Sequence, residues 1–168
     1  ENSAATQAMF EGRRTGLEWA FDRPVGGGSI AYYFGKDLQG DNPGTTAAAR
    51  AYWTPLRMER ATIHLGVAGS VENPRGHTDG RDVFTPTSAR FRARPQAGLT
   101  GIRLVDSGRI ADVGRIDRLG LETLWISGPW SLQGEYLRAD AHRAPATGAP
   151  GYSASGWYVM GGLIATGE

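Results

Sequence analysis

The sequence predicts an all-β protein, and more specifically an antiparallel transmembrane β-barrel with a long loop folded inward. Seven segments alternate between apolar residues and small or polar ones, which is the period of a β-strand. Short polar turns and long polar loops separate these segments, an asymmetry that bacterial outer-membrane barrels share. The chain has no run of about 18 consecutive apolar residues, which excludes a membrane-spanning helix.

The predicted strands are 15–22, 29–35, 50–54, 61–71, 119–125, 130–136 and 156–165. The alternation is clearest over 61–71, where Ile63, Leu65 and Val67 share one face and His64 and Gly66 lie on the other. The last segment is less clean because both of its faces are largely apolar or aromatic. Short turns follow the first, third and fifth predicted strands at "RPVGGG", "PLRMER" and "SGPW", whereas "KDLQGDNPGTT" and "DAHRAPATGAPGYS" are long.

The composition sets limits on function. The 168 residues suffice for one domain, which we take as a single barrel segment over 1–168. There is no cysteine, which excludes thiolate metal sites, and the net charge of +1 gives no global field for nucleic acid. Lys36 is the only lysine among 18 basic residues, a bias that reflects either a GC-rich genome or bidentate recognition of anions by arginine. We expect any signal peptide to precede Glu1.

The tryptophans give the barrel an orientation. Trp53, Trp125 and Trp130 border predicted short turns, and Trp19 approaches another. Aromatic side chains gather where a membrane meets water, so we expect them to form one belt on the periplasmic side. The alternative is that they are ordinary edges of a hydrophobic core.

Strand direction places the segment 72–118. If the first predicted strand runs down, 61–71 runs up and 119–125 runs down, so 72–118 begins and ends on the extracellular side. The segment is therefore one long loop or contains an even number of strands, such as a hairpin within 88–105. Structureless loops of this length are uncommon unless they are functional. We expect 72–118 to fold into the barrel lumen.

The stretch "ARFRARPQ" within this segment repeats arginine at every second position, at Arg90, Arg92 and Arg94. In an extended chain the three guanidinium groups share one face. We expect that face to line the pore and bind anions, with Arg103 as a weaker candidate and Arg50 as another because its strand face points inward. A solvated edge strand is the alternative.

Other chemistry is sparse. His64, His77 and His142 are isolated and lack carboxylates at metal-ligand spacing, so we expect no metal, no cofactor and no enzymatic activity. Glu18, Glu122 and Glu135 fall on the inward faces, where we expect them to act as counter-charges rather than as a catalytic pair.

The segments "ARFRARPQ", "GIRLVDSG", "LGLETLWISGPWSLQGEYLRAD" and "SGWYVMGGLIATGE" resemble the phosphate-selective porins O and P in order and spacing. The resemblance implies a trimeric, sixteen-stranded barrel in the outer membrane of a Gram-negative bacterium, of which this chain supplies about seven to nine strands. It also implies an arginine ladder, carried here by Arg90, Arg92 and Arg94. The family's lysine cluster has no counterpart, which favours a general anion channel over strict phosphate selectivity.

The sequence thus predicts a channel for passive diffusion of small anions, such as inorganic phosphate or polyphosphate, in contact with outer-membrane lipid and not with nucleic acid. Two alternatives stay open. One is a self-contained eight-stranded outer-membrane barrel, and the other is a soluble β-sandwich that binds polyanions.

Overall fold

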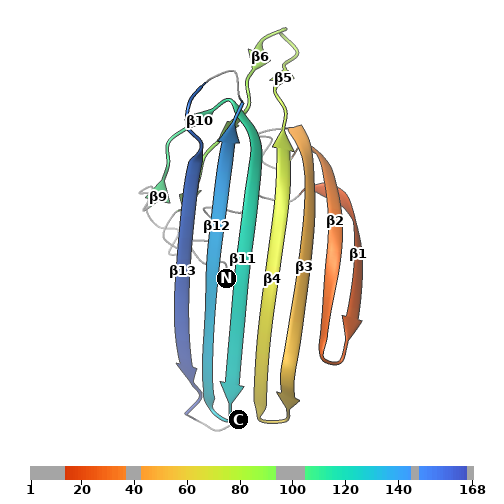
Figure 1. The fold of residues 1–168 in the computed structure, drawn as a ribbon, viewed down its shortest axis with the longest axis vertical. Helices are drawn as coiled ribbons and strands as arrows, with labels where there is room; N and C mark the ends of the chain where they lie inside the picture. The colour runs from red at the N-terminus through yellow and green to blue at the C-terminus, as the bar shows by residue number, and fades with distance from the viewer. Residues whose placement is uncertain (1–13, 37–42, 94–104, 145–147, 166–168) are drawn as a thin grey trace.

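The computed structural model describes residues 14–36, 43–93, 105–144 and 148–165, and nearly all of them belong to one large antiparallel sheet or to the segment folded against it (Figure 1). No helix in the described part of the chain is long and apolar enough to cross a membrane. The strands of the large sheet are β1 (Thr15–Arg23), β2 (Gly26–Lys36), β3 (Pro43–Met58), β4 (Ala61–Pro74), β11 (Val113–Ser127), β12 (Trp130–Arg143) and β13 (Tyr152–Leu163).

The order of strands in this seven-stranded sheet is β1-β2-β3-β4-β11-β12-β13, and every neighbouring pair is antiparallel. All seven predicted strands are therefore present, and β4 pairs directly with β11. Residues Pro24–Val25, Glu59–Arg60 and Gly128–Pro129 form the short turns, all at the lower end in Figure 1, and the segment between β4 and β11 lies at the upper end. The sheet does not close on itself, and β1 and β13 are its edges.

The strands extend beyond the predicted ones, most of all in β3. This strand has 16 residues, whereas alternation was evident only over 50–54. Its first half contains Ala47, Ala48 and Ala49, which place the same side chain on both faces and so give no periodic signal. Pairing with β2 on one side and β4 on the other defines these residues as strand. The register with β4 shifts between Trp53 and Leu56, a local irregularity near the short turn.

The two faces of the sheet differ in chemistry. One, which we call the apolar face, carries large side chains such as Leu17, Ile30, Val67, Leu121 and Leu132, and Leu17 is 77% exposed. The other, which we call the polar face, carries Glu18, Arg50, His64, Glu122 and Glu135 at alternate positions of the same strands. So many exposed apolar side chains on one side indicate a surface that is covered by something other than water.

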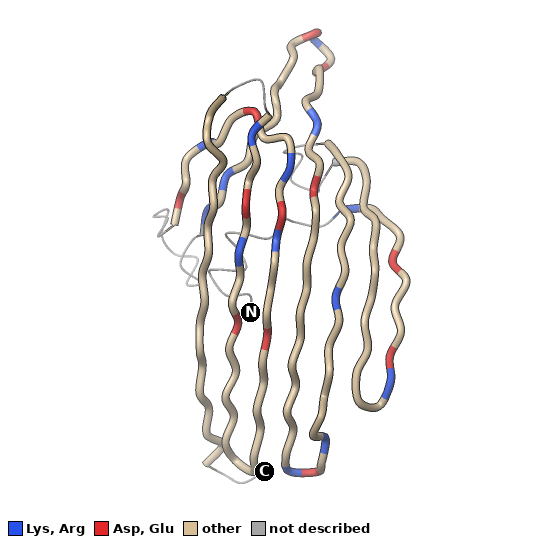
Figure 2. The backbone as a smooth tube through the Cα atoms, in the orientation of Figure 1, with Lys and Arg blue, Asp and Glu red and all other residues tan. Residues whose placement is uncertain are grey.

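The apolar face ends in a group of ion pairs near its upper end. Asp117 and Asp140 lie opposite each other on β11 and β12. Arg115 donates to Asp117 at 2.7 Å, Arg138 donates to Asp140 at 2.8 Å, and His142 Nε2 lies 3.0 Å from Asp117. Figure 2 shows charged residues gathered in this upper part of β11 and β12, while the described part of β13 carries none. This face thus changes from apolar to ionic side chains toward its upper end.

The tryptophans are exposed on the apolar face. Trp53, Trp125 and Trp130 lie near the short turns, at 55%, 41% and 55% exposure. The register places Trp19 in the same row as Ala49, Gly69 and Leu119, farther from those turns.

Residues 75–112 form no strand of the large sheet where they are described. They contain short strands that pair with one another: β5 (His77–Thr78) with β6 (Phe84–Thr85), β7 (Ser88–Ala89) with β10 (Ile110–Ala111), and β8 (Arg92–Ala93) with β9 (Val105–Asp106). The possible hairpin within 88–105 thus takes the form of small separate pairings, and part of that range lies outside the described residues.

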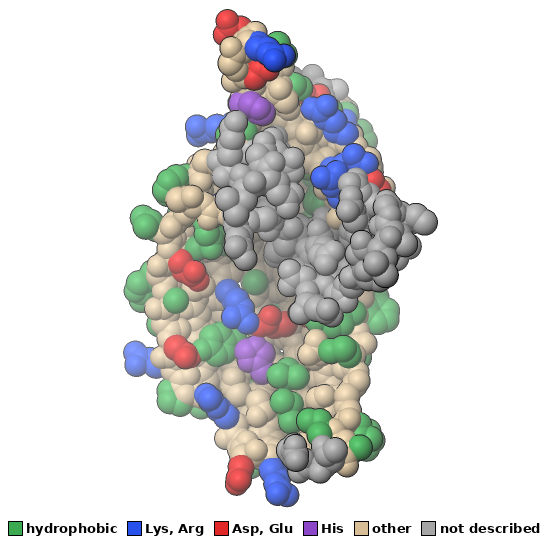
Figure 3. Space-filling view, turned by 180° about the vertical axis from the view of Figure 1, so that it is seen from behind, with side chains coloured by type: hydrophobic (Ala, Val, Ile, Leu, Met, Phe, Trp, Pro, Cys, Tyr) green, Lys and Arg blue, Asp and Glu red, His purple; other side chains and the backbone are tan. Residues whose placement is uncertain are grey.

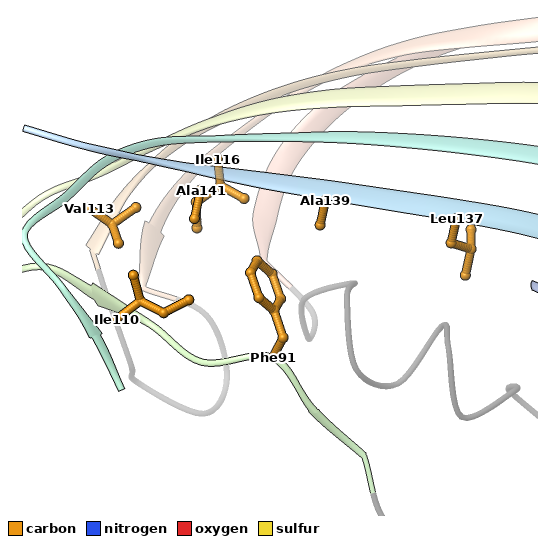
Figure 4. Packing of buried hydrophobic residues seen from close by; sticks show 7 residues of the cluster. All are labelled: Phe91, Ile110, Val113, Ile116, Leu137, Ala139 and Ala141. Carbon is orange, nitrogen blue, oxygen red and sulfur yellow. The ribbon is translucent and has the colours of Figure 1, made fainter. Parts of the chain in front are cut away.

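The hydrophobic core lies between this segment and the upper part of the polar face (Figure 4). Phe91 is its centre on the segment side; it is 4% exposed and its ring stacks on Tyr152 with centroids 5.7 Å apart. The remaining buried members are Ile110, Val113, Ile116, Leu137, Ala139 and Ala141. The segment is therefore anchored against β11 and β12 by apolar packing.

Candidate functional site

Arg90 and Arg92 lie on either side of the Phe91 anchor. Because side chains alternate along an extended chain, burial of Phe91 against the sheet turns both arginines to the opposite side. The Phe91 N–H donates to Ser107 Oγ at 3.0 Å, and the Ser107 N–H donates to the Phe91 carbonyl at 2.9 Å. These bonds fix the segment's path and thereby the position of both arginines.

Arg90 is held by a carboxylate. Its Nε donates to Asp106 Oδ1 at 2.7 Å and its Nη2 donates to Oδ2 at 2.5 Å, the planar fork that guanidinium and carboxylate groups form. The hydrogen bond to Asp106 raises the pKa of Arg90 above its usual value. Arg92 is exposed and forms no ion pair with any described residue. Arg94 and Arg103 lie outside the described residues.

Arg50 projects from β3 onto the polar face, about midway along the sheet. Its guanidinium donates to Glu122 of β11 and lies 5.5 Å from the centroid of the Tyr52 ring. Glu122 also meets His64 of β4, whose Nε2 lies 3.0 Å from Oε1. Figure 3 looks onto this face and shows basic, acidic and histidine side chains side by side. The structure does not bring Arg50 into contact with Arg90 or Arg92.

Two further arginines, which were not among the predicted site residues, lie on the polar face. Arg14 donates to Glu72 Oε1 at 2.8 Å, and Arg118 donates to Glu72 Oε2 at 2.9 Å. The Glu72 side chain is fully buried, and those of Arg14 and Arg118 are 4% and 5% exposed. A buried carboxylate is thus shared by two buried guanidinium groups.

A signal for these residues was present in the sequence. Extending the predicted alternation of 61–71 by one residue places Glu72 on the inward face with His64. Extending 119–125 toward the N-terminus does the same for Arg118, which is two residues before Gly120. Extending 15–22 likewise reaches Arg14, two residues before Gly16. The predicted strands 15–22, 61–71 and 119–125 each end one residue short of these three residues.

An open hollow of about 520 Å³ lies on the polar face between β1 and β11. Arg14, Arg50 and Arg118 all line it, and Glu18 is the carboxylate at its β1 side. Apart from Tyr33, the wall between them carries mostly small side chains, among them Ser29, Ala31, Ala48, Ala68 and Ser70. The small residues leave room for a solvated ion, and the guanidinium groups favour an anion.

The three described histidines lie on three different strands. His64 meets Glu122, His142 meets Asp117 on the apolar face, and His77 belongs to β5. Among residues 14–36, 43–93, 105–144 and 148–165, no group of three or more His, Asp or Glu side chains could hold a metal ion.

Comparison with protein families gives one match, and it spans the chain. The family described as phosphate-selective porin O and P matches residues 1–168. A comparison with curated proteins found no match.

Proposed function

The chain belongs to the phosphate-selective porin O and P family, and from this premise we propose that it forms part of the wall of a channel through which small anions diffuse passively. The family consists of outer-membrane porins of Gram-negative bacteria, so channel function is the coarse expectation. The finer proposal concerns which residues line the path and which solutes pass.

One observation carries the proposal: arginines gather on the face opposite the exposed apolar side chains. Arg14, Arg50 and Arg118 line a single hollow of the polar face. Trp157 and Val159, on the apolar face, are 73% and 63% exposed. A barrel wall in a membrane has lipid on one side and water on the other, so this division supports a lumen on the arginine side.

The arginines suit passage rather than tight capture. Each guanidinium offers a planar fork of donors to an oxyanion, and same-face residues of a strand are about 6.6–7 Å apart, so an anion could meet one arginine before it leaves another. Arg90 and Arg50 each face a carboxylate, Asp106 and Glu122. These carboxylates weaken the binding of an anion at each arginine, and conduction requires several weak binding sites.

We assign the path to Arg90, Arg92 and Arg94 of the inward segment 72–118, with Arg103 and Arg50 as further members. The packing of Phe91 against the polar face supports an inward position for this segment. Inorganic phosphate, polyphosphate and other small anions are the proposed solutes. The homotrimer that the family resemblance implies, with lipid around it, is part of the same proposal.

The two alternatives are less well supported. A self-contained eight-stranded barrel would need β1 and β13 to be joined, and neither has a second strand partner among the described residues. A soluble sandwich would bury the apolar face, which is exposed along all seven strands. Open sheet edges are not tolerated in lipid, so we propose that further strands complete the barrel.

Reconstitution of the full-length porin in planar bilayers tests the proposal. Under a KCl gradient we expect an anion-selective reversal potential that moves toward zero when Arg90, Arg92 and Arg94 are all changed to alanine. The control changes Arg115 and Arg138 to alanine, which removes basic side chains from the apolar face and should leave selectivity unchanged. A cation-selective wild-type channel would refute the function.

A further inference from the structure

Glu122 reaches Arg50 across an intervening strand. Glu122 lies on β11 and Arg50 on β3, and β4 separates the two strands. The β4 residue opposite Glu122 is Gly66. A Cβ atom at Gly66 would lie 2.6 Å from Glu122 Cγ and 2.7 Å from Cδ, so the glutamate side chain lies directly over the glycine. The absence of a side chain at Gly66 lets the carboxylate span the strand and contact the guanidinium.

His64 contacts the same carboxylate oxygen. Its Nε2 is 3.0 Å from Glu122 Oε1, the oxygen that also accepts from Arg50. The ring stacks on Tyr52 with centroids 5.4 Å apart, and Thr54 Oγ1 lies 3.5 Å from Nδ1 on its other side. The imidazole is thus held in place, and Glu122 is shared between a permanent cation and a titratable group.

From this geometry we propose that Glu122 competes with permeating anions for Arg50, and that the charge on His64 sets how strongly it competes. The inference rests on the proposed function, because it assumes that anions pass the polar face. It adds two residues that determine selectivity at one step of the path. Neither is an arginine, and neither belongs to the inward segment.

The charge balance gives the direction of the effect. With His64 neutral, Arg50 and Glu122 cancel, and a passing anion must displace a carboxylate to reach the guanidinium. When His64 gains a proton, the three groups carry a net charge of about one positive unit, and the carboxylate is shared between two cations. Histidine changes charge between about pH 5 and 8, so anion preference should increase as the pH falls through this range.

Other charged side chains lie around His64 on the polar face. Arg57 of β3, Glu135 of β12 and, beyond the Tyr52 ring, Asp22 of β1 share the polar face with it. Asp22 accepts from the Tyr52 hydroxyl, and Glu135 lines the hollow that also contains His64, Glu122 and Tyr158. These neighbours are the same in the wild type and in the variants at Glu122 and His64, so their contribution is common to that comparison.

The experiment compares chloride and potassium permeability of the full-length porin in planar bilayers at pH 8 and pH 5.5. Chloride is the probe because phosphate itself titrates in this range. The first variant is Glu122→Gln, which should raise the chloride-to-potassium permeability ratio about threefold at pH 8, the size of an exposed ion pair. His64→Gln should keep the wild-type ratio of pH 8 at both pH values.

Two control variants distinguish the direct contact between Glu122 and Arg50 from the long-range electrostatic effect of a negative charge on the polar face. Glu135→Gln removes the same charge from the residue directly opposite Glu122 in the register, on the side away from Arg50. It should change the ratio less and keep the pH response. Glu122→Asp keeps the charge but is one methylene shorter and cannot span Gly66, so it should raise the ratio as Glu122→Gln does.

The possible outcomes test the competition, the role of His64 and the proposed function separately. Equal shifts for Glu122→Gln and Glu135→Gln, or a wild-type ratio in Glu122→Asp, would overturn the competition. A pH response that survives in His64→Gln would overturn the part of the inference that concerns His64. An anion-selective wild type with any of these results leaves the proposed function standing, whereas a cation-selective wild type contradicts the function itself.

Discussion

Replacement of Glu72 by glutamine should destabilise the folded protein far more than the same change elsewhere on the polar face. Glu72 Oε1 accepts from Arg14 and Oε2 accepts from Arg118. Glutamine keeps the shape but has only one oxygen, so one guanidinium group would face an amide N–H₂. Two donors would then oppose each other in a place where all three side chains are at least 95% buried.

Breaking a buried ion pair by removing one partner costs about 3–5 kcal/mol, because a charge is left without compensation. Each 1.4 kcal/mol is about a factor of ten, so the unfolding equilibrium should change by about two to three and a half orders of magnitude. Glu122→Gln is the matched control. Its side chain is 33% exposed, and loss of its ion pair should cost at most about 1 kcal/mol.

Equilibrium unfolding in guanidinium chloride, followed by tryptophan fluorescence of the protein in detergent micelles, measures both changes. We expect a clearly lower midpoint for Glu72→Gln and a midpoint near that of the wild type for Glu122→Gln. Equal and small shifts for the two variants would show that the Glu72 group is hydrated in solution, and the reasoning from burial would fail.

Two more predictions concern the faces of the sheet and the inward segment. Leu121→Arg places a charge on the apolar face and should make the free energy of folding into lipid vesicles less favourable by about 2–4 kcal/mol. Leu124→Arg places the same charge on the polar face and should be tolerated. Similar yields of folded protein for the two variants, measured by gel shift, would contradict the assignment of the faces. Phe91→Ala should lose about 3–5 kcal/mol of packing and expose the segment 72–118 to limited proteolysis, while Phe84→Ala, whose ring is 64% exposed, should leave the cleavage pattern unchanged.

The number and order of strands could be read from the sequence because alternation is a local property. It is strong wherever one face carries large apolar side chains, as in β4. It fails in the first half of β3, where alanine occupies both faces, and only hydrogen bonding to β2 and β4 defines the strand. Strand ends were also missed, because the apolar face of β11 and β12 changes to charged side chains such as Asp117 and Asp140 before the strands end.

The site was less predictable, because its contacts join residues far apart in the chain. The assignment of Arg50, Arg90 and Arg92 to the pore stays a prediction, and the carboxylate partners of Arg50 and Arg90 could not be named from the sequence. Asp106 lies 16 residues beyond Arg90, and Glu122 lies 72 residues beyond Arg50. Such pairs depend on which strands become neighbours and on where a glycine leaves space, and neither is visible in local periodicity.

The ion pair between Arg14 and Glu72 has a geometric consequence. Arg14 immediately precedes β1 and Glu72 belongs to β4, with β2 and β3 between these strands. Adjacent strands are about 4.8 Å apart, so three steps along the sheet cover about 14 Å of wall. The ion pair connects the two ends of this curved part of the sheet directly, and its length helps to fix how tightly the wall curves. A mutation there would change the bore of the channel as well as its stability.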